Sequence, residues 1–388
     1  MNNFKLKLHD PVVIARRPEV SEEGKIPWGP YQFPGCEYTQ EGYIHATFNV
    51  GADSVRAYGL VANPHFISKD EGKTWTLAEP EKDFVGGTVL PDGTRLGFTA
   101  RPSVDPKELN LPETPDGVHT FWNHPAYFYH ASHFSEESNA FTLRRLPAGE
   151  TEWRTELKVV DLPDKLCRAC IEGVVPHQVV FEKAISPSGD FWGVFYPWFL
   201  DGYNGRPCFQ PTFIVSKDSG ETFEYRGTIP YEPIPEADPK YDKRDGFSEP
   251  FIEFLSNGDI VCLMRTQDGN GQGPSYITFS HDEGRTWEKP QIFDDLGVLP
   301  QLCTLGCGVT LSSYGRPGIF IRATDDPTAH VWQDRLTVLE HQYTCAYTRF
   351  LPLNDTTALF FYTDFIYPDD DGVKHKTVLC RKVEVVFD

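Results

Sequence analysis

The sequence of 388 residues lacks an apolar run that could cross a bilayer, since no stretch approaches the ~18 apolar residues of a transmembrane helix. Basic residues are also scarce: 36 Lys and Arg stand against 56 Asp and Glu, for a formal net charge of −20. We therefore expect neither nucleic acid nor an anionic membrane as a partner, because phosphate binding requires a net basic surface. The first residues show no apolar signal-peptide core and no small-residue cleavage site, which predicts a cytoplasmic location.

Methionine is rare and no long amphipathic helix pattern is visible, whereas turn-forming and aromatic residues are plentiful. The chain has 2 Met, 32 Gly and 32 Pro, and 14% of its residues are aromatic. Such a composition favours short strands joined by turns. Because no Ser/Gly-rich linker divides the chain, we expect one all-β domain over residues 1–388.

The nine cysteines do not suggest a disulfide framework, because their number is odd and they are scattered through strand-like stretches. We interpret them as reduced thiols of a cytosolic protein. Cys167 and Cys170 have CxxC spacing, but no second pair or histidine stands at zinc-finger spacing, so buried thiols are favoured over zinc. The sequence predicts neither a metal nor a cofactor.

One phrase, Ser-x-Asp-x-Gly-x-Thr-aromatic, recurs along the chain. Its copies are SKDEGKTW at 68–75, SKDSGETF at 216–223 and SHDEGRTW at 280–287, with a degenerate TDDPTAHVW at 324–332. The spacing of their aspartates predicts a repeat of about 60–70 residues, with one degenerate copy between the first two.

A second phrase, two apolar runs around a turn, accompanies the first. It occurs as TVLPDGTRLGF at 88–98, ISPSGDFWGVFY at 185–196, FIEFLSNGDIVCLMR at 251–265 and FLPLNDTTALFFY at 350–362. The central Gly, Asn and Asp residues accept the positive φ of tight hairpin turns. Repeated units of a few antiparallel strands around an axis form a β-propeller, and the chain length divided by the repeat gives about six blades.

The Ser-x-Asp-x-Gly phrase is best explained as a structural turn. Its short Asp can accept backbone N–H groups within the turn, its Gly adopts a conformation closed to other residues, and its aromatic ring packs beneath. The phrase resembles the Asp box (bacterial neuraminidase repeat) of the sialidase superfamily. That resemblance implies a six-bladed propeller with blades of four antiparallel strands. Asp boxes occur in several unrelated propellers, so a function must rest on other residues.

Polar residues within apolar runs are candidates for a site at the propeller axis, because a buried charge is costly unless it is used or paired. In GFSEPFIEFLSNGDIVCLMRTQDG (246–269), Glu249 opens a strand and Arg265 ends the return strand, at the same end of the hairpin. The pair resembles the sialidase segment in which a Glu polarises a nucleophilic Tyr and an Arg binds the substrate carboxylate. The alternative is an ion pair that closes a blade.

Two later segments extend the resemblance. Arg316, in the bend of SSYGRPGIFIR (312–322), is similar in its order to the last arginine of the sialidase carboxylate cluster; the alternative is an arginine stacked on an aromatic ring such as Tyr314. Tyr347, in CAYTRFLPLNDTTALFFYTDF (345–365), is the positional match for the sialidase nucleophile, although a strand tyrosine usually serves packing. Asp364, in the same segment, is a candidate acid/base or sugar-hydroxyl ligand.

The early part of the chain offers three further candidates. His177 and His45 interrupt apolar runs, where a histidine can act as an acid or base or can be a satisfied core residue. The placement of His177 also resembles sialidase-like bacterial proteins with a Pro-His pair in that blade. Arg101, in TARPSVD (99–105), is the early substrate-binding candidate, but neither it nor ARRPEV (15–20) is a clean match to the Arg-Ile-Pro segment of sialidases.

The resemblance implies a sialidase-like exo-glycoside hydrolase that acts on a terminal acidic sugar, sialic acid or a uronate. Glu249 and Tyr347 would form the nucleophilic pair, and Arg265 and Arg316 would hold the carboxylate. A lyase that abstracts a proton beside a uronate carboxylate is an alternative function. A propeller that binds carbohydrate or a protein without catalysis is a third.

Overall fold

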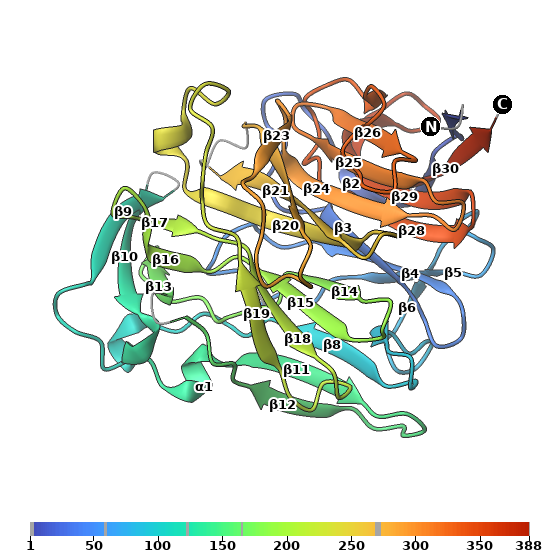
Figure 1. Ribbon diagram of the computed structural model, residues 1–388. Helices are drawn as coiled ribbons and strands as arrows, with labels where there is room; N and C mark the ends of the chain where they lie inside the picture. Colours follow the sequence, from blue (N-terminus) through green and yellow to red (C-terminus); the bar gives the residue numbers. More distant parts are fainter. Residues whose placement is uncertain (1–3, 58–59, 122–123, 164–165, 268–272, 388) are drawn as a thin grey trace.

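Six antiparallel sheets follow one another along the chain and form the blades of a β-propeller (Figure 1). The computed structural model describes residues 4–57, 60–121, 124–163, 166–267 and 273–387. Each blade has four antiparallel strands at its core, and the first two strands of a blade are joined by a tight hairpin. The expected six-bladed all-β propeller is therefore confirmed.

The first three blades occupy the N-terminal half. Blade 1 consists of β3 (Gln32–Tyr38), β4 (Ile44–Asn49), β5 (His65–Ser68) and β6 (Thr76–Ala78). Blade 2 consists of β7 (Thr88–Val89), β8 (Arg95–Thr99), β11 (Phe141–Leu146) and β12 (Arg154–Lys158). Blade 3 consists of β14 (Glu182–Ile185), β15 (Phe191–Phe195), β18 (Thr212–Ser216) and β19 (Glu224–Thr228).

The last three blades follow in the C-terminal half. Blade 4 consists of β20 (Gly246–Phe254), β21 (Ile260–Gln267), β22 (Ser275–Ser280) and β23 (Gln291–Asp294). Blade 5 consists of β24 (Val298–Thr304), β25 (Thr310–Gly315), β26 (Ile319–Thr324) and β27 (Leu336–Leu339). Blade 6 consists of β28 (Arg349–Asn354), β29 (Thr357–Pro368), β30 (Lys374–Phe387), β1 (Phe4–Leu8) and β2 (Val12–Val20).

Blade 6 closes the ring with both ends of the chain. Strand β30 pairs with β1, where Phe4 lies opposite Phe387, and also with β2, where Val12 lies opposite Cys380. The two termini therefore lie close together at the upper right of Figure 1. This pairing covers sheet edges that would otherwise be exposed.

A further sheet, which the sequence analysis did not anticipate, is inserted into blades 2 and 3. This insertion sheet has the order β17 (Arg206–Phe209), β16 (Trp198–Tyr203), β13 (Leu166–Ile171), β10 (His124–His130) and β9 (Gly117–Phe121). A single parallel pair, Phe209 with Gly246, joins it to β20. The described helices are short: η1 (Pro106–Glu108), η2 (Ala131–His133), α1 (Glu136–Asn139) and η3 (Tyr241–Lys243). No helix in the described part of the chain is long and apolar enough to span a bilayer.

The four apolar hairpin phrases each form the first hairpin of a blade, namely blades 2, 3, 4 and 6. The core lies mainly between neighbouring blades. One cluster of buried residues joins Val309 and Ile321 of blade 5 to Phe360 and Leu379 of blade 6. Because each blade buries both faces against its neighbours, a single blade would expose most of its apolar surface.

The three Ser-x-Asp-x-Gly turns connect the third and fourth strands of blades 1, 3 and 4, and they share the same hydrogen bonds. At 280–287, the carboxylate of Asp282 accepts the N–H of Thr286 at 2.9 Å and its hydroxyl at 2.7 Å, and it accepts the Ser280 hydroxyl at 2.9 Å. Asp70 and Asp218 accept the corresponding groups. These bonds satisfy each turn internally.

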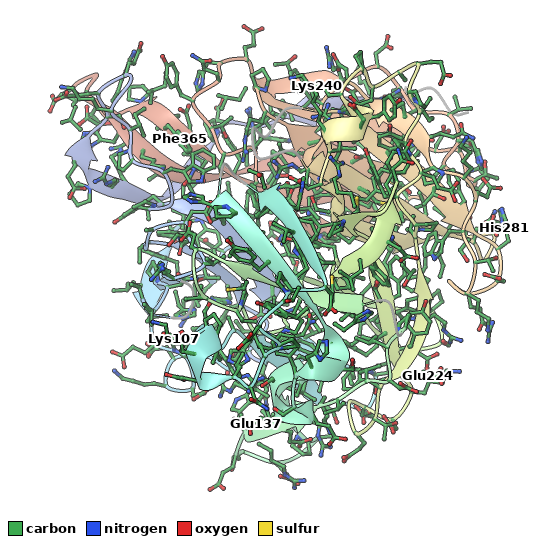
Figure 2. All side chains as sticks on the ribbon, turned by 90° about the vertical axis from the view of Figure 1, so that its left-hand side faces the viewer. Lys107, Glu137, Glu224, Lys240, His281 and Phe365 are labelled. Atoms are coloured by element: carbon green, nitrogen blue, oxygen red, sulfur yellow. The ribbon has the colours of Figure 1, made fainter. Side chains whose placement is uncertain are left out.

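The turn glycines also fix the distance to the preceding blade. A Cβ at Gly284 would lie 2.8 Å from the ring of Trp192, on β15 of blade 3. Gly220 meets Leu96 of blade 2 in the same way, and Gly72 meets Leu359 of blade 6. His281, beside Asp282, points outward at the rim (Figure 2). The repeated turns thus determine blade spacing at the perimeter, away from the pocket described next.

Candidate active site

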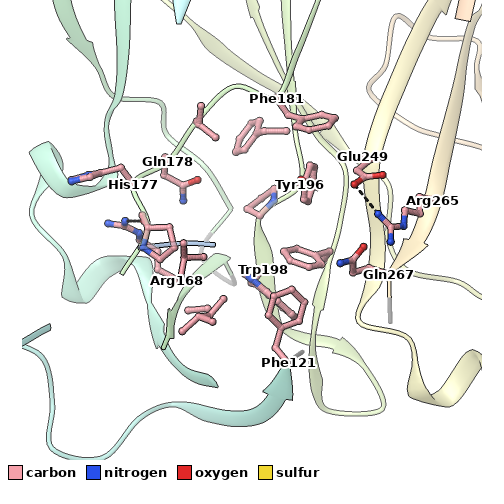
Figure 3. Close-up of a pocket in the computed structure, with 18 of the residues that line it drawn as sticks. Phe121, Arg168, His177, Gln178, Phe181, Tyr196, Trp198, Glu249, Arg265 and Gln267 are labelled. Atoms are coloured by element: carbon pink, nitrogen blue, oxygen red, sulfur yellow. Dashed lines mark hydrogen bonds and ion pairs between the residues drawn. The ribbon is translucent and has the colours of Figure 1, made fainter. Parts of the chain in front are cut away.

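A pocket of about 630 Å³ lies between the inner blade strands and the insertion sheet (Figure 3). Its charged lining comprises three guanidinium groups and two carboxylates, from Arg168, Arg265, Arg316, Asp53 and Glu249. The lining therefore carries a net positive charge in a protein whose formal net charge is −20. Such a local excess favours an anionic ligand.

Glu249 is the centre of one side of the pocket, and only 4% of its surface is exposed. Its Oε1 accepts a hydrogen bond of 2.8 Å from Nη1 of Arg265 and a short hydrogen bond from the Tyr347 hydroxyl. Its Oε2 accepts the backbone N–H of Leu299 at 2.9 Å. The carboxylate is thus held by donors from three blades, and the predicted proximity of Glu249 and Arg265 is observed.

Three inner strands bulge in or beside the pocket, and each bulge contains a residue of positive φ followed by proline. These dipeptides are Phe33-Pro34 on β3, Glu249-Pro250 on β20 and Leu299-Pro300 on β24, with φ of 58°, 50° and 41° at the first residue. A bulge leaves one residue out of the ladder and redirects its groups. The freed N–H of Leu299 therefore reaches Glu249, and this strain coincides with the site.

The surroundings of Tyr347 keep its phenol protonated. Burial raises the pKa of Tyr347 well above its ordinary value, and the adjacent Glu249 carboxylate raises it further. The ring of Phe33 packs against it with centroids 4.6 Å apart. Burial lowers the pKa of the Arg265 guanidinium, but Glu249 and Tyr347 more than compensate, so its pKa is raised and it remains charged.

Arg316 follows β25 and lies over aromatic rings at the same side of the pocket. Its guanidinium is 4.8 Å from the ring centroid of Trp28 and 5.9 Å from that of Tyr347, and it donates to the Cys345 carbonyl at 2.6 Å. Burial and the nearby charge of Arg265 lower its pKa. The ring that stacks on Arg316 is therefore that of Trp28 and not that of Tyr314, whose hydroxyl donates to Asp294.

The loop after β4 contributes a second carboxylate. Asp53 lines the pocket and accepts a hydrogen bond of 2.7 Å from Nε1 of Trp28. Trp28 also packs edge-on against Phe365, with ring centroids 6.0 Å apart. These contacts place the carboxylate of Asp53 beside the ring that carries Arg316.

The opposite side of the pocket comes from the insertion sheet and from the segment before β14. Figure 3 shows Arg168, His177 and Gln178 there, facing Glu249, Arg265 and Gln267, with Tyr196 between them. Burial and the charges of Arg101 and Arg168 lower the pKa of His177 to about 4. The imidazole is therefore neutral at physiological pH.

No protein-family model matches the sequence, and no curated protein matches it. The structure is similar to a protein of unknown function from Dyadobacter fermentans over 98% of this chain and 99% of that one, with a TM-score of 0.63 at 18% identity. A NanB sialidase mutant from Streptococcus pneumoniae aligns over 96% of this chain and 70% of its own, with a TM-score of 0.54 at 12% identity. An α-L-arabinanase from Penicillium chrysogenum aligns over 96% and 98%, with a TM-score of 0.52 at 14% identity.

This chain shares their propeller fold. At these identities the similarity concerns architecture, and any chemistry must be argued from the pocket itself.

The pocket brings together five of the predicted site residues: His177, Glu249, Arg265, Arg316 and Tyr347. The other three predicted residues are not among its lining residues.

His45 lies within blade 1, where it contacts Glu37 and His65 at 3.2 and 2.9 Å, because the strand register places Glu37 directly opposite it and His65 diagonally across from it. Arg101 lies behind the pocket wall and donates to backbone carbonyls of Glu137 and Ala140. Asp364, on the second strand of blade 6, accepts the N–H of Ile366 at 2.8 Å and lies 3.5 Å from His341.

Sequence reasoning missed Asp53, Trp28 and the aromatic lining from the insertion sheet. Asp53 stands in a loop with no motif around it, whereas the X-Pro dipeptides at 33–34, 249–250 and 299–300 were a usable signal for the inner strands. The inner strand of blade 1 reads Gln32-Phe33-Pro34 and contains no arginine. Of the two Arg-Pro segments considered, 15–20 overlaps β2 of blade 6 and 99–105 follows β8.

Proposed function

We propose that the protein is an exo-acting glycoside hydrolase that removes a terminal acidic sugar, a sialic acid or a uronate, through nucleophilic attack by Tyr347. The observation that supports this most is the hydrogen bond from the Tyr347 hydroxyl to Glu249 inside a net positive pocket. A bounded pocket suits the end of a glycan better than its middle. A neutral phenol approaches an anionic sugar without the repulsion that a carboxylate nucleophile would meet.

The first step forms a bond between the Tyr347 oxygen and the anomeric carbon while the glycosidic bond breaks. The phenolic proton passes to Glu249 as attack proceeds, since Tyr347 is protonated in the resting site. Leaving-group departure requires a proton on the glycosidic oxygen, and the carboxyl group of Asp53, the second acidic group of the pocket, donates it.

In the second step, water attacks the anomeric carbon and gives its proton to Asp53. The Tyr347 oxygen then departs and recovers its proton from Glu249. Two carboxyl groups from different blades thus each take part in two proton transfers, and the product retains the anomeric configuration.

Arg265 and Arg316 are the proposed contacts for the sugar carboxylate. Both line the pocket, and both guanidinium groups lie near enough to Tyr347 to affect its pKa. Arg265 also balances the charge of Glu249 at 2.8 Å. With Gln32 on β3 in place of an arginine, the clamp has two arginines on this side, which favours uronates alongside sialic acids as substrates.

A uronate lyase is the second candidate, because the neutral imidazole of His177 lies in the same pocket as three arginines. A neutral imidazole can accept a proton adjacent to a carboxylate whose charge an arginine offsets. An unsaturated product that absorbs in the ultraviolet would identify this reaction.

Hydrolysis of aryl α-sialosides and aryl β-glucuronides tests the proposal. We expect turnover by the wild type and a loss in kcat of about 10³-fold or more for Tyr347→Phe, because the nucleophilic oxygen is removed. Tyr343→Phe is the matched control, since its hydroxyl bonds to Glu23 away from the pocket, at 3.2 Å. Full activity of Tyr347→Phe, or no turnover of any acidic glycoside by the wild type, would contradict the proposal.

A further inference from the structure

Two arginines at the side opposite Glu249, Arg168 in the pocket wall and the half-buried Arg101 behind it, have no carboxylate partner among the described residues. Arg168, on β13, is only 4% exposed, and it donates to the carbonyls of Ser138, at 2.6 Å, and Pro176. Arg101 donates to the carbonyls of Glu137 and Ala140 at 2.9 and 2.8 Å. Among the residues that the structure describes, neither arginine forms an ion pair with a carboxylate.

Neutral carbonyls orient these guanidinium groups but leave their positive charge. Burying a charge without a counter-ion is costly, so buried arginines normally lie beside a carboxylate or bind an anion. The other buried arginine of the pocket illustrates the contrast, because Arg265 pairs with Glu249.

His177 completes this wall. Its Nδ1 is buried and has no hydrogen-bond partner within the described part of the chain. Arg101 and Arg168 are the charged groups that act on it, and both disfavour its protonation. The residue lines the pocket together with Arg168 and Gln178, so a ligand group there can meet a guanidinium charge, an imidazole and an amide at once.

The space between the two walls is lined by aromatic rings, including Phe181, Tyr196 and Trp198. Such surfaces accept the apolar face of a sugar ring, while the polar groups at each end fix its orientation. The volume of about 630 Å³ falls well within the range of ~300–1,000 Å³ for pockets that enclose ligands larger than a few atoms.

We propose that Arg168, His177 and Gln178 form a second anion-binding subsite, which receives a carboxylate or sulfate on the group attached to the terminal sugar. The preferred substrate is then an acidic oligosaccharide with charges on two adjacent units. This inference rests on the proposed function, because that function assigns the terminal sugar to the Tyr347 side. The subsite itself consists of Arg168, His177 and Gln178, so its ability to bind an anion does not depend on hydrolysis.

The test measures binding without catalysis, in the Tyr347→Phe/Arg316→Met double variant, which removes the nucleophile and weakens the first carboxylate contact. Inorganic sulfate, free glucuronate and uncharged glucose serve as probes, and the imidazole signals of His177 are followed by NMR. We expect saturable shifts with sulfate or glucuronate and none with glucose. We also expect the pKa of His177 to rise on saturation, because a bound anion offsets Arg101 and Arg168.

Arg168→Gln is expected to weaken the anion response at least tenfold, and His177→Leu, followed by calorimetry, provides a second variant if Arg168→Gln does not fold. The relative affinities of sulfate and glucuronate distinguish a sulfated from a carboxylated neighbour. The proposal is overturned if neither anion shifts His177, or if Arg168→Gln and His177→Leu bind both anions as the parent does. Absence of hydrolysis by the wild type would refute the proposed function, but anion binding at the subsite would still support this inference.

Discussion

The turns at the rim and the strand ends at the pocket belong to the same blades but treat polar groups differently. In the turns, Asp70, Asp218 and Asp282 repeat one set of hydrogen bonds, and each carboxylate is satisfied by its own turn. In the pocket, the lining residues differ from blade to blade, and Glu249 accepts hydrogen bonds from Arg265 of its own blade and from groups of blades 5 and 6. The residues that repeat from blade to blade build the ring. The residues that differ between blades line the pocket and are suited to chemistry.

The largest expected effect separates these two roles. Glu249→Gln should reduce kcat by about 10³-fold or more, because the amide cannot accept the phenolic proton of Tyr347. Asp282→Asn should leave kcat/KM within about twofold while lowering the free energy of unfolding by about 1–2 kcal/mol, since it weakens the bonds from Thr286. Activity assays and urea unfolding of both variants check this. A large loss of activity in Asp282→Asn would contradict the purely structural role assigned to the turns.

A smaller effect should appear at the turn glycines. Gly284→Ala should lower the free energy of unfolding by about 2–4 kcal/mol, because φ is +78° and the new Cβ would lie 2.8 Å from Trp192. Gly258→Ala is the control in the same blade: φ is +92°, but nothing lies within 4 Å, so about 1 kcal/mol is expected. Equal losses, measured by urea unfolding, would show that the turn does not set blade spacing.

The smallest effect concerns a buried charge behind the pocket. Lys376 is 0% exposed, donates to the Pro27 carbonyl at 2.8 Å, and lies 4.2 Å from the Phe365 ring centroid. Burial lowers its pKa to about 7. Between pH 7 and about 10 the unfolded chain therefore binds more protons than the folded one, so stability should rise with pH across that window.

Lys376→Met should remove this rise, and the position of Trp28, which follows Pro27, should loosen enough to raise KM. Urea unfolding at several pH values and steady-state kinetics check both effects. Lys374→Met, which removes an exposed contact with Glu23, is the control. If the free energy of unfolding of Lys376→Met still rises with pH as in the wild type, other groups cause the rise.

Much of the fold could be predicted from local sequence, because hairpin turns and the Ser-x-Asp-x-Gly phrase encode their own hydrogen bonds within eight residues or so. The proximity of Glu249 and Arg265 could also be predicted, since one hairpin joins them. The contact of Tyr347 with Glu249 spans 98 positions and was reached through the family resemblance.

Other parts of the site depend on packing that no short motif records. The insertion sheet is built from segments within blades 2 and 3 and between them, so Phe121 and Trp198 join Arg168 and His177 in one pocket only in the folded ring. Asp53 owes its place to a hydrogen bond from Trp28, which precedes it by 25 positions in another loop. Each depends on long-range geometry rather than on local preference.

The closure of blade 6 has a consequence for biosynthesis. Strand β2 precedes Trp28 and pairs with β30, whereas Tyr347 precedes β28, so the synthesis of blades 1 to 5 separates these segments in time. Blades 1 to 5 can begin to stack while synthesis continues, but the rings of Phe33 and Tyr347 can meet only after the segment before β28 has emerged. A nascent chain therefore holds an incomplete pocket until the segment that carries Tyr347, which follows blade 5, has been made.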